Sequence, residues 1–141
     1  MPSDCAFCAI AGDGSEAHVV FEDEVSLAFL DNRPLFPGHS LLIPRAHHEA
    51  IWDLPGELVE PYFANARMLA SAVREAMGAQ GAFVALNNIV SQSVPHLHTH
   101  VVPRNRKDGL RGFFWPRSKY EDDTAAKAAA DAVRQAVARV A

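Results

Sequence analysis

The chain has 141 residues, of which 49% are apolar and 21% charged, and this composition suits one folded domain while excluding global disorder, a coiled coil or a collagen-like repeat. No apolar run approaches the ~20 residues of a membrane helix and no secretory signal opens the chain, so we expect a cytoplasmic protein without membrane contacts. The formal net charge of -4 argues against a nucleic-acid partner.

Apolar segments between turn-rich stretches predict five short strands. In chain order they cover residues 18–22, 25–30, 39–43, 82–88 and 96–102. The first seventeen residues look small and loop-like. The stretch 31–38 contains two prolines and a glycine, which predicts another loop.

A long helix is predicted between the third and fourth strands. It begins at Asp53 as N-cap, is kinked or restarted at Pro61, and reaches about Met77 before a stop at Gly78. Its expected apolar face consists of Val59, Phe63, Ala66, Leu69, Val73 and Met77.

A second, alanine-rich helix is predicted over residues 125–140, capped by Asp123 or Thr124. The short connections between strands favour antiparallel pairing and hence an α+β fold. No linker is visible, so we expect one domain over residues 1–141, with 104–141 as a C-terminal tail and helix.

Seven histidines are the unusual feature of the composition, and three of them alternate along the last predicted strand. His96, His98 and His100 share one face of that strand, with about 6.8 Å between successive side chains. Imidazole can act as nucleophile, acid or hydrogen-bond donor near neutral pH, so the pattern indicates phosphate chemistry or a metal site; an exposed polar face is the plain alternative. The residues just before the strand can donate to phosphate oxygens: Asn87, Asn88, Ser91, Gln92 and Ser93.

Cys5 and Cys8 form a C-x-x-C pair near the start of the chain. Two thiolates alone do not complete a tetrahedral zinc site. A redox dithiol and two free thiols therefore stay open as alternatives.

Several further motifs stand in a fixed order around the three histidines. Residues 96–102 (HLHTHVV) alternate histidine with mostly apolar positions, and residues 37–47 (PGHSLLIPRAH), Phe29-Leu30-Asp31 and Gln92-Ser93-Val94 precede them. Asp108-Gly109, Trp115 and Tyr120 follow. Together they resemble the histidine triad (HIT) family of Hint- and Fhit-like nucleotide hydrolases, in its zinc-containing bacterial form. The resemblance implies a HIT-like α+β fold with an antiparallel sheet of about five strands, one central helix and one C-terminal helix.

The resemblance also implies an activity and its catalytic residues. The expected enzyme is a hydrolase or transferase that cleaves at the α-phosphate of a nucleotide derivative through a covalent nucleotidyl-histidine. By this resemblance His98 is the nucleophile, His100 bonds the phosphate or leaving group, His39 supports the triad and His96 completes it. The alternative for His39 is a structural histidine whose hydrogen bonds are satisfied within the fold.

Candidate substrate-binding residues follow from the same comparison. Asp31 resembles the acid that contacts the ribose hydroxyls, and an Asx turn is its alternative role. Asn87, Gln92 and Ser93 would surround the phosphate. Phe7, Ile10 and Phe29 match apolar positions of the base pocket, although each also suits an ordinary core.

The resemblance supplies partners for the two cysteines. It implies a closed tetrahedral, structural Zn²⁺ site whose ligands are Cys5, Cys8, His47 and His96. It further implies a homodimer, with the helix predicted at residues 53–77 as a candidate interface element.

The substrate stays open among nucleoside phosphoramidates and dinucleoside polyphosphates, the latter cleaved by water or by phosphate. Pro103-Arg104 and the basic segment 104–119 tilt the choice slightly toward polyphosphates. Two other classes are a non-catalytic nucleotide-binding signalling module and a metal hydrolase that uses His96, His98 and His100 as ligands.

Some features depart from the family pattern. Thr99 stands at an apolar position, Arg45 replaces a lysine, and the stretch 87–92 is shorter than the glycine-rich loop of many relatives. The segment 104–119 carries six of the thirteen basic residues against one acid. We expect its Trp115 near a dimer contact and some of its arginines near phosphate.

Overall fold

The computed structural model describes residues 4–13, 16–110 and 117–140. It divides the chain into two units, Met1–Asp108 and Gly109–Ala141. The predicted single domain over 1–141 therefore stays a prediction. Within the described residues no helix is long and apolar enough to cross a membrane.

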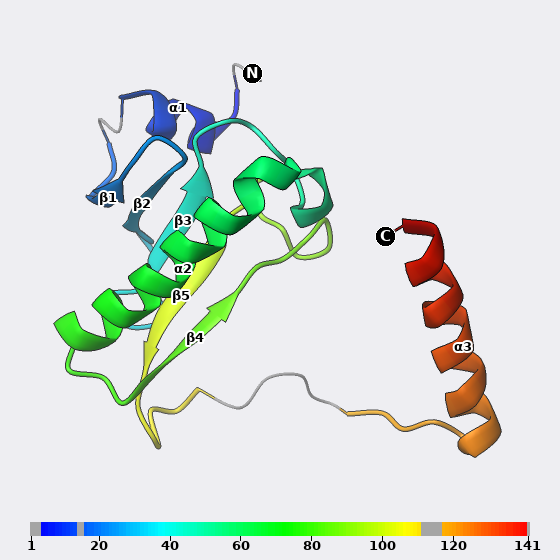
Figure 1. Ribbon diagram of the computed structural model, residues 1–141. Helices are drawn as coiled ribbons and strands as arrows, with labels where there is room; N and C mark the ends of the chain where they lie inside the picture. The colour runs from blue at the N-terminus through cyan, green and yellow to red at the C-terminus, as the bar shows by residue number, and fades with distance from the viewer. Residues whose placement is uncertain (1–3, 14–15, 111–116, 141) are drawn as a thin grey trace. The chain divides into compact units, whose positions relative to one another are not determined.

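The first unit is built on a five-stranded antiparallel sheet (Figure 1). Its strands are β1 (Val19–Glu22), β2 (Ser26–Leu30), β3 (Ser40–Pro44), β4 (Gly81–Ala85) and β5 (Thr99–Arg104), in the spatial order β1-β2-β3-β5-β4. The helices are α1 (Ala6–Asp13), the 3₁₀ turn η1 (Ile51–Asp53) and α2 (Gly56–Ala76), while α3 (Asp123–Val140) belongs to the second unit. The predicted α+β fold is confirmed.

The sheet separates two apolar clusters because side chains alternate along its strands. Ala28 of β2 and Leu42 of β3 pack with the apolar face of α2. Leu27, Phe29 and their neighbours on β3 pack instead with α1. The functional residues described below lie on the α1 side of the sheet.

Helix α1 corrects the loop expected for the first seventeen residues. Phe7, Cys8 and Ala11 form its buried face against the sheet. A helix of eight residues is not stable by itself, so packing rather than propensity makes it helical. The i, i+4 spacing of Phe7 and Ala11 was the available signal.

The start of α2 also differs from the prediction. Asp53 does not cap it; its Oδ2 accepts the backbone N–H of Ala50 at 3.0 Å and closes η1. Pro61 lies inside α2 without ending it, because only one backbone donor is lost. Gly78, at φ +60°, follows the helix where the stop was expected.

The buried face of α2 is rotated relative to the predicted one. Val59 and Met77 are exposed, whereas Tyr62 is fully buried. The Tyr62 hydroxyl lies 2.8 Å from both the Leu42 carbonyl and the Thr99 hydroxyl. This hydrogen bond to the buried tyrosine explains why threonine stands at position 99, where the family pattern has an apolar residue.

The ends of two strands also differ from the prediction. β5 begins only at Thr99, so His96 and His98 lie just before the strand rather than in it, although His98 and His100 still face the α1 side. β4 ends at Ala85 instead of residue 88.

In the second unit, α3 begins at Asp123, and Asp122 Oδ1 accepts the N–H of Ala125 at 2.8 Å. The cap is therefore one residue earlier than predicted. None of the described residues of α3 is buried.

Candidate active site and metal centre

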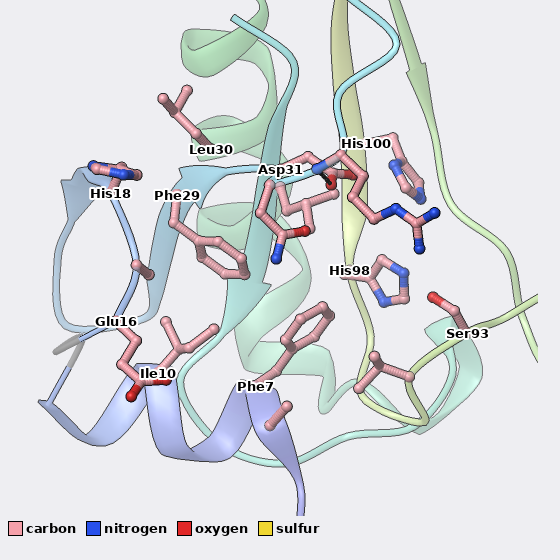
Figure 2. A pocket seen from close by; sticks show the side chains of 16 residues that line it. Phe7, Ile10, Glu16, His18, Phe29, Leu30, Asp31, Ser93, His98 and His100 are labelled. Carbon is pink, nitrogen blue, oxygen red and sulfur yellow. Dashed lines mark hydrogen bonds between the residues drawn. The ribbon is translucent and has the colours of Figure 1, made fainter.

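A cavity of about 390 Å³ opens between α1, the end of β2 and the segment that leads into β5. Figure 2 shows His98, His100 and Ser93 at one end of it. Ile10, Glu16 and His18 lie at the other end, with Phe7, Phe29 and Asp31 between them. The cavity thus has a histidine end and a largely apolar end.

His98 is held in one orientation at the histidine end. Its Nδ1 donates to the carbonyl of His96 at 2.8 Å, which leaves Nε2 as the nitrogen with a free lone pair. The Phe7 ring meets the imidazole edge-on, with centroids 5.0 Å apart, and the side chain is only 2% exposed. An imidazole fixed in this way, with a lone pair on Nε2, can act as a nucleophile.

His39 and His100 form a short relay whose tautomers follow from one backbone donor. The N–H of Leu35 donates to His39 Nδ1 at 3.0 Å, so a neutral His39 carries its proton on Nε2. That nitrogen lies 3.0 Å from His100 Nδ1. His100 therefore accepts through Nδ1 and keeps an N–H donor on Nε2.

Asp31 approaches the same nitrogen of His39 that faces His100. Its Oδ2 lies 3.5 Å from His39 Nε2, and its Oδ1 accepts the N–H of Arg33 at 2.9 Å. The Asx turn and the position beside the cavity are thus both present. Asp31, His39 and His100 also group closely enough to hold a metal ion. The proton on His39 Nε2 favours the hydrogen-bonded arrangement instead.

Burial keeps both histidines of the relay neutral. Burial lowers the pKa of His100 to about 4, with further lowering by His98 and His39. Burial also lowers the pKa of His39, opposed by the charge of Asp31.

We predict that His100 remains neutral during acidification until about pH 4. An unfolded histidine binds its proton near pH 6.5, so the unfolded state takes up more protons in this window. The contribution of neutral His100 to the free energy of unfolding is therefore fully present above pH 6.5, and it is lost as the pH falls toward 4. Imidazole ¹⁵N NMR measures the titration directly. A His100 midpoint near 6.5 contradicts the relay.

A second cluster lies behind His98, and it unites the four predicted metal ligands. The ligand atoms of Cys5, Cys8, His47 and His96 all lie within 4.8 Å of one another. Cys8 Sγ is 3.2 Å from His47 Nδ1, and both sulfurs are 3.5 Å from His96 Nδ1. Bonds of about 2.3 Å to sulfur and 2.0–2.1 Å to nitrogen produce ligand separations of this size around tetrahedral zinc.

The chemistry of these donors also suits a metal. His96 Nε2 donates to the Pro44 carbonyl at 2.9 Å, which turns Nδ1 toward the two sulfurs. Burial lowers the pKa of His96 to about 4, so its Nδ1 lone pair is free. Burial, followed by the neighbouring Cys5, raises the pKa of the Cys8 thiol to about 11. This shift by itself disfavours the thiolate that zinc requires, and a bound cation would reverse it. The residues fit a closed, structural Zn²⁺ site.

The orientation of His96 bears on the alternative of a three-histidine metal centre. His96 Nδ1 faces the cysteines, whereas His98 Nδ1 bonds a carbonyl and His100 Nδ1 faces His39. Within the described part of the chain, the three triad rings do not form a metal-binding group.

Five of the predicted substrate residues line the cavity: Phe7, Ile10, Phe29, Asp31 and Ser93. Asn87 and Gln92 do not. The Gln92 side chain is committed to the loop, since its amide donates to the Glu49 carbonyl at 2.6 Å and its oxygen accepts the N–H of Ile89 at 3.0 Å.

The loop 87–92 is held in an unusual backbone conformation. Ile89 and Ser91 have φ values of 71° and 62°, a region that residues other than glycine rarely adopt. Asn88 Oδ1 accepts the N–H of Ile51 at 2.7 Å. This bond anchors the loop 87–92 to the η1 segment.

Glu16, His18 and Arg33 also line the cavity, and the sequence reasoning missed them. Glu16 and His18 precede β1 and Arg33 follows Asp31, so only their closeness to a predicted strand end could have signalled them. Arg104 is paired with Asp108 at 2.6 Å. Trp115 lies outside the described residues.

The α+β fold, the histidine pair beside a cavity and the Cys/His cluster behind it define a histidine-triad protein. A family model described as the HIT domain matches residues 13–107, and the chain belongs to this family. The membership of the HIT family that the sequence motifs predicted is therefore confirmed.

Two curated relatives are similar in sequence to this chain. The chain is 31% identical over 112 residues to an adenylylsulfatase of Arabidopsis thaliana, covering 78% of this chain but only 57% of that relative. It is 33% identical over 126 residues to an adenosine 5'-monophosphoramidase of Saccharomyces cerevisiae, covering 87% of this chain and 77% of the relative. The prediction that the chain belongs to the class of HIT-type enzymes is therefore confirmed.

Solved structures show the same fold. A HIT family protein from Bacillus subtilis has a TM-score of 0.84 at 30% identity, covering 94% of this chain and 96% of that chain. A zinc-bound histidine triad protein from Mycobacterium smegmatis has a TM-score of 0.71 at 36% identity, covering 94% and 97%.

Proposed function

We propose that the protein is a nucleotide hydrolase that cleaves at the α-phosphate of a nucleotide derivative through a covalent intermediate on His98. The observation that carries the proposal is the fixed tautomer of His98. Its Nδ1–H is bound to the His96 carbonyl, and the ring borders the cavity beside His100 and Ser93. The activities named for the two curated relatives support the choice of an adenylyl substrate.

In the first step the lone pair of His98 Nε2 attacks phosphorus, forming a P–N bond. The bond from phosphorus to the leaving group breaks, and its electron pair departs with that group; a sulfate or phosphate leaves as the anion, whereas an amine leaving group takes a proton from water. Water then attacks phosphorus and gives up a proton to the solvent, the P–N bond returns its electrons to His98, and a nucleoside monophosphate is released. His100 Nε2–H and the Ser93 hydroxyl donate to the phosphate oxygens in both steps.

The rest of the cavity suits the nucleoside. The Asp31 carboxylate can accept from the two ribose hydroxyls. Beyond Asp31, an apolar surface for the base is formed by Phe7, Ile10 and Phe29. The rings of Phe7 and Phe29 meet edge-on with their centroids 5.4 Å apart, and this contact keeps the surface rigid.

We include a structural Zn²⁺ held by Cys5, Cys8, His47 and His96. Bound there, the ion supplies a cross-link between α1, the segment after β3 and the approach to β5. His96 lies two residues from His98 and provides the carbonyl that fixes its tautomer. The role of this cluster is therefore to position the nucleophile.

We also propose the homodimer implied by the family resemblance. β4 is an edge of the sheet, and Val84 on it is 47% exposed. Such an edge can pair with a second copy. Sedimentation at the mass of a monomer would exclude this part of the proposal.

Turnover of three substrate mixtures tests the proposed activity. The purified protein is incubated with an adenosine phosphoramidate, with a diadenosine polyphosphate, and with the latter plus inorganic phosphate. Release of AMP supports the proposal, and a nucleoside diphosphate formed only with added phosphate indicates phosphorolysis. Nucleotide binding without turnover of any of these substrates favours the non-catalytic module.

A further inference from the structure

The backbone of Arg33 is connected to the triad by a chain of short contacts. Its backbone N–H donates to Asp31 Oδ1 at 2.9 Å, and Asp31 Oδ2 lies 3.5 Å from His39 Nε2. His39 in turn contacts His100 at 3.0 Å. The Arg33 side chain lines the same cavity as His98 and His100.

The charge of Arg33 is not used within the described residues. Arg33 forms no ion pair with any of them. It is also the only lysine or arginine among the residues that line this cavity. A guanidinium binds tetrahedral oxyanions through paired N–H donors, and it keeps its charge at any relevant pH.

The relay points to the same kind of ligand. His100 presents an N–H from a neutral ring, because its Nδ1 accepts from His39. A neutral imidazole N–H is a hydrogen-bond donor but a poor acid, so it can stabilise oxygens without supplying a proton. A leaving group that is stable as an anion needs no proton, whereas an amine does.

From these observations we infer that Arg33 forms a subsite for an anionic leaving group, a phosphate or sulfate joined to the α-phosphate of the nucleotide. The subsite rests on the proposed function and narrows its substrate class. It distinguishes such compounds from nucleoside phosphoramidates, whose leaving group is neutral. As the leaving bond breaks, its electron pair passes to the sulfate or phosphate oxygen, and the guanidinium holds the charge that develops there.

The test compares Arg33→Gln and Arg33→Lys with the unchanged protein on three substrates. Adenosine 5'-phosphosulfate and a diadenosine polyphosphate release sulfate and a nucleotide anion, respectively, and adenosine 5'-phosphoramidate releases ammonia. Arg67→Gln, on the opposite face of the sheet in α2, is the matched control for loss of an exposed arginine. Circular dichroism confirms that each variant is folded.

We expect Arg33→Gln to lower kcat/KM for the anionic-leaving substrates by about 10- to 100-fold, the value of a hydrogen bond to a charged group. The phosphoramidate should change by less than about 3-fold, and Arg33→Lys should recover part of the loss. Equal losses on both substrate types would overturn the subsite but leave the hydrolase standing. Efficient turnover of the phosphoramidate alone would also overturn the subsite, and absence of all turnover would overturn the hydrolase and the subsite together. If only one anionic substrate responds to Arg33→Gln, that substrate identifies which anion the subsite takes.

Discussion

Replacing His98 with alanine is expected to reduce AMP release by about 10⁴-fold or more. The substitution removes the atom that forms the P–N bond, and enzymes that lose their nucleophile fall to the residual rate supplied by binding alone. Steady-state kinetics with an adenosine phosphoramidate measures the effect. Binding of AMP should persist, because Asp31 and the apolar end of the cavity are unchanged.

His98→Gly provides the matching control. It leaves a space beside Phe7 that free imidazole can enter, since the two rings are in contact in the native protein. Added imidazole should restore part of the rate in His98→Gly and none in a variant with a larger apolar side chain, His98→Phe. A rate for His98→Ala within 10-fold of the native protein would eliminate His98 as nucleophile.

Loss of the proposed zinc ion should have the largest effect on stability. Cys8→Ser, or prolonged chelation, is expected to lower the free energy of unfolding by on the order of 5 kcal/mol, because structural zinc contributes folding energy directly. For a chain of this length the midpoint of thermal unfolding should fall by about 10 to 20 °C. Thermal denaturation followed by circular dichroism records the change.

Elemental analysis accompanies this experiment. We expect one zinc per chain in protein purified without chelators, and less in Cys8→Ser. His48→Ala removes a neighbouring histidine that is not in the cluster, so it should retain the metal. Metal-free native protein that is as stable as the zinc-loaded form would refute a structural zinc site.

The C-x-x-C pair and the three histidines could be recognised in the sequence because each motif has a fixed local spacing and residue type. Cys5 and Cys8 meet His96 although they lie about ninety residues away, and no periodicity encodes that distance. Only resemblance to a family could pair them. The alternating apolar residues around the histidines sufficed to predict which face they share.

Features decided by tertiary packing were not accessible in the same way. The helix α1 has only eight residues, and it forms because Phe7 and Ala11 are buried against the sheet. Gln92 has the residue type of a phosphate donor, yet the shortened loop uses its amide to bind Glu49. Local sequence does not determine which of two polar partners a side chain takes.

The relay was only partly predictable. Asp31 and His39 were recognised separately, but the donor that fixes the tautomers is the backbone N–H of Leu35, which every non-proline residue carries. Arg33 was missed because an arginine in a loop ordinarily faces solvent. Its position in the cavity depends on the Asx turn at Asp31.

The proposed mechanism requires a covalent bond between the nucleotide and His98. Rapid acid-free quenching of the reaction with an adenosine phosphoramidate, followed by peptide mass spectrometry, tests it most directly. We predict a peptide containing residues 96–104 that carries one adenylyl group on His98, with no such species in His98→Ala. Multiple turnovers with no labelled peptide at any quench time, or with the adenylyl group on His100, would contradict the mechanism.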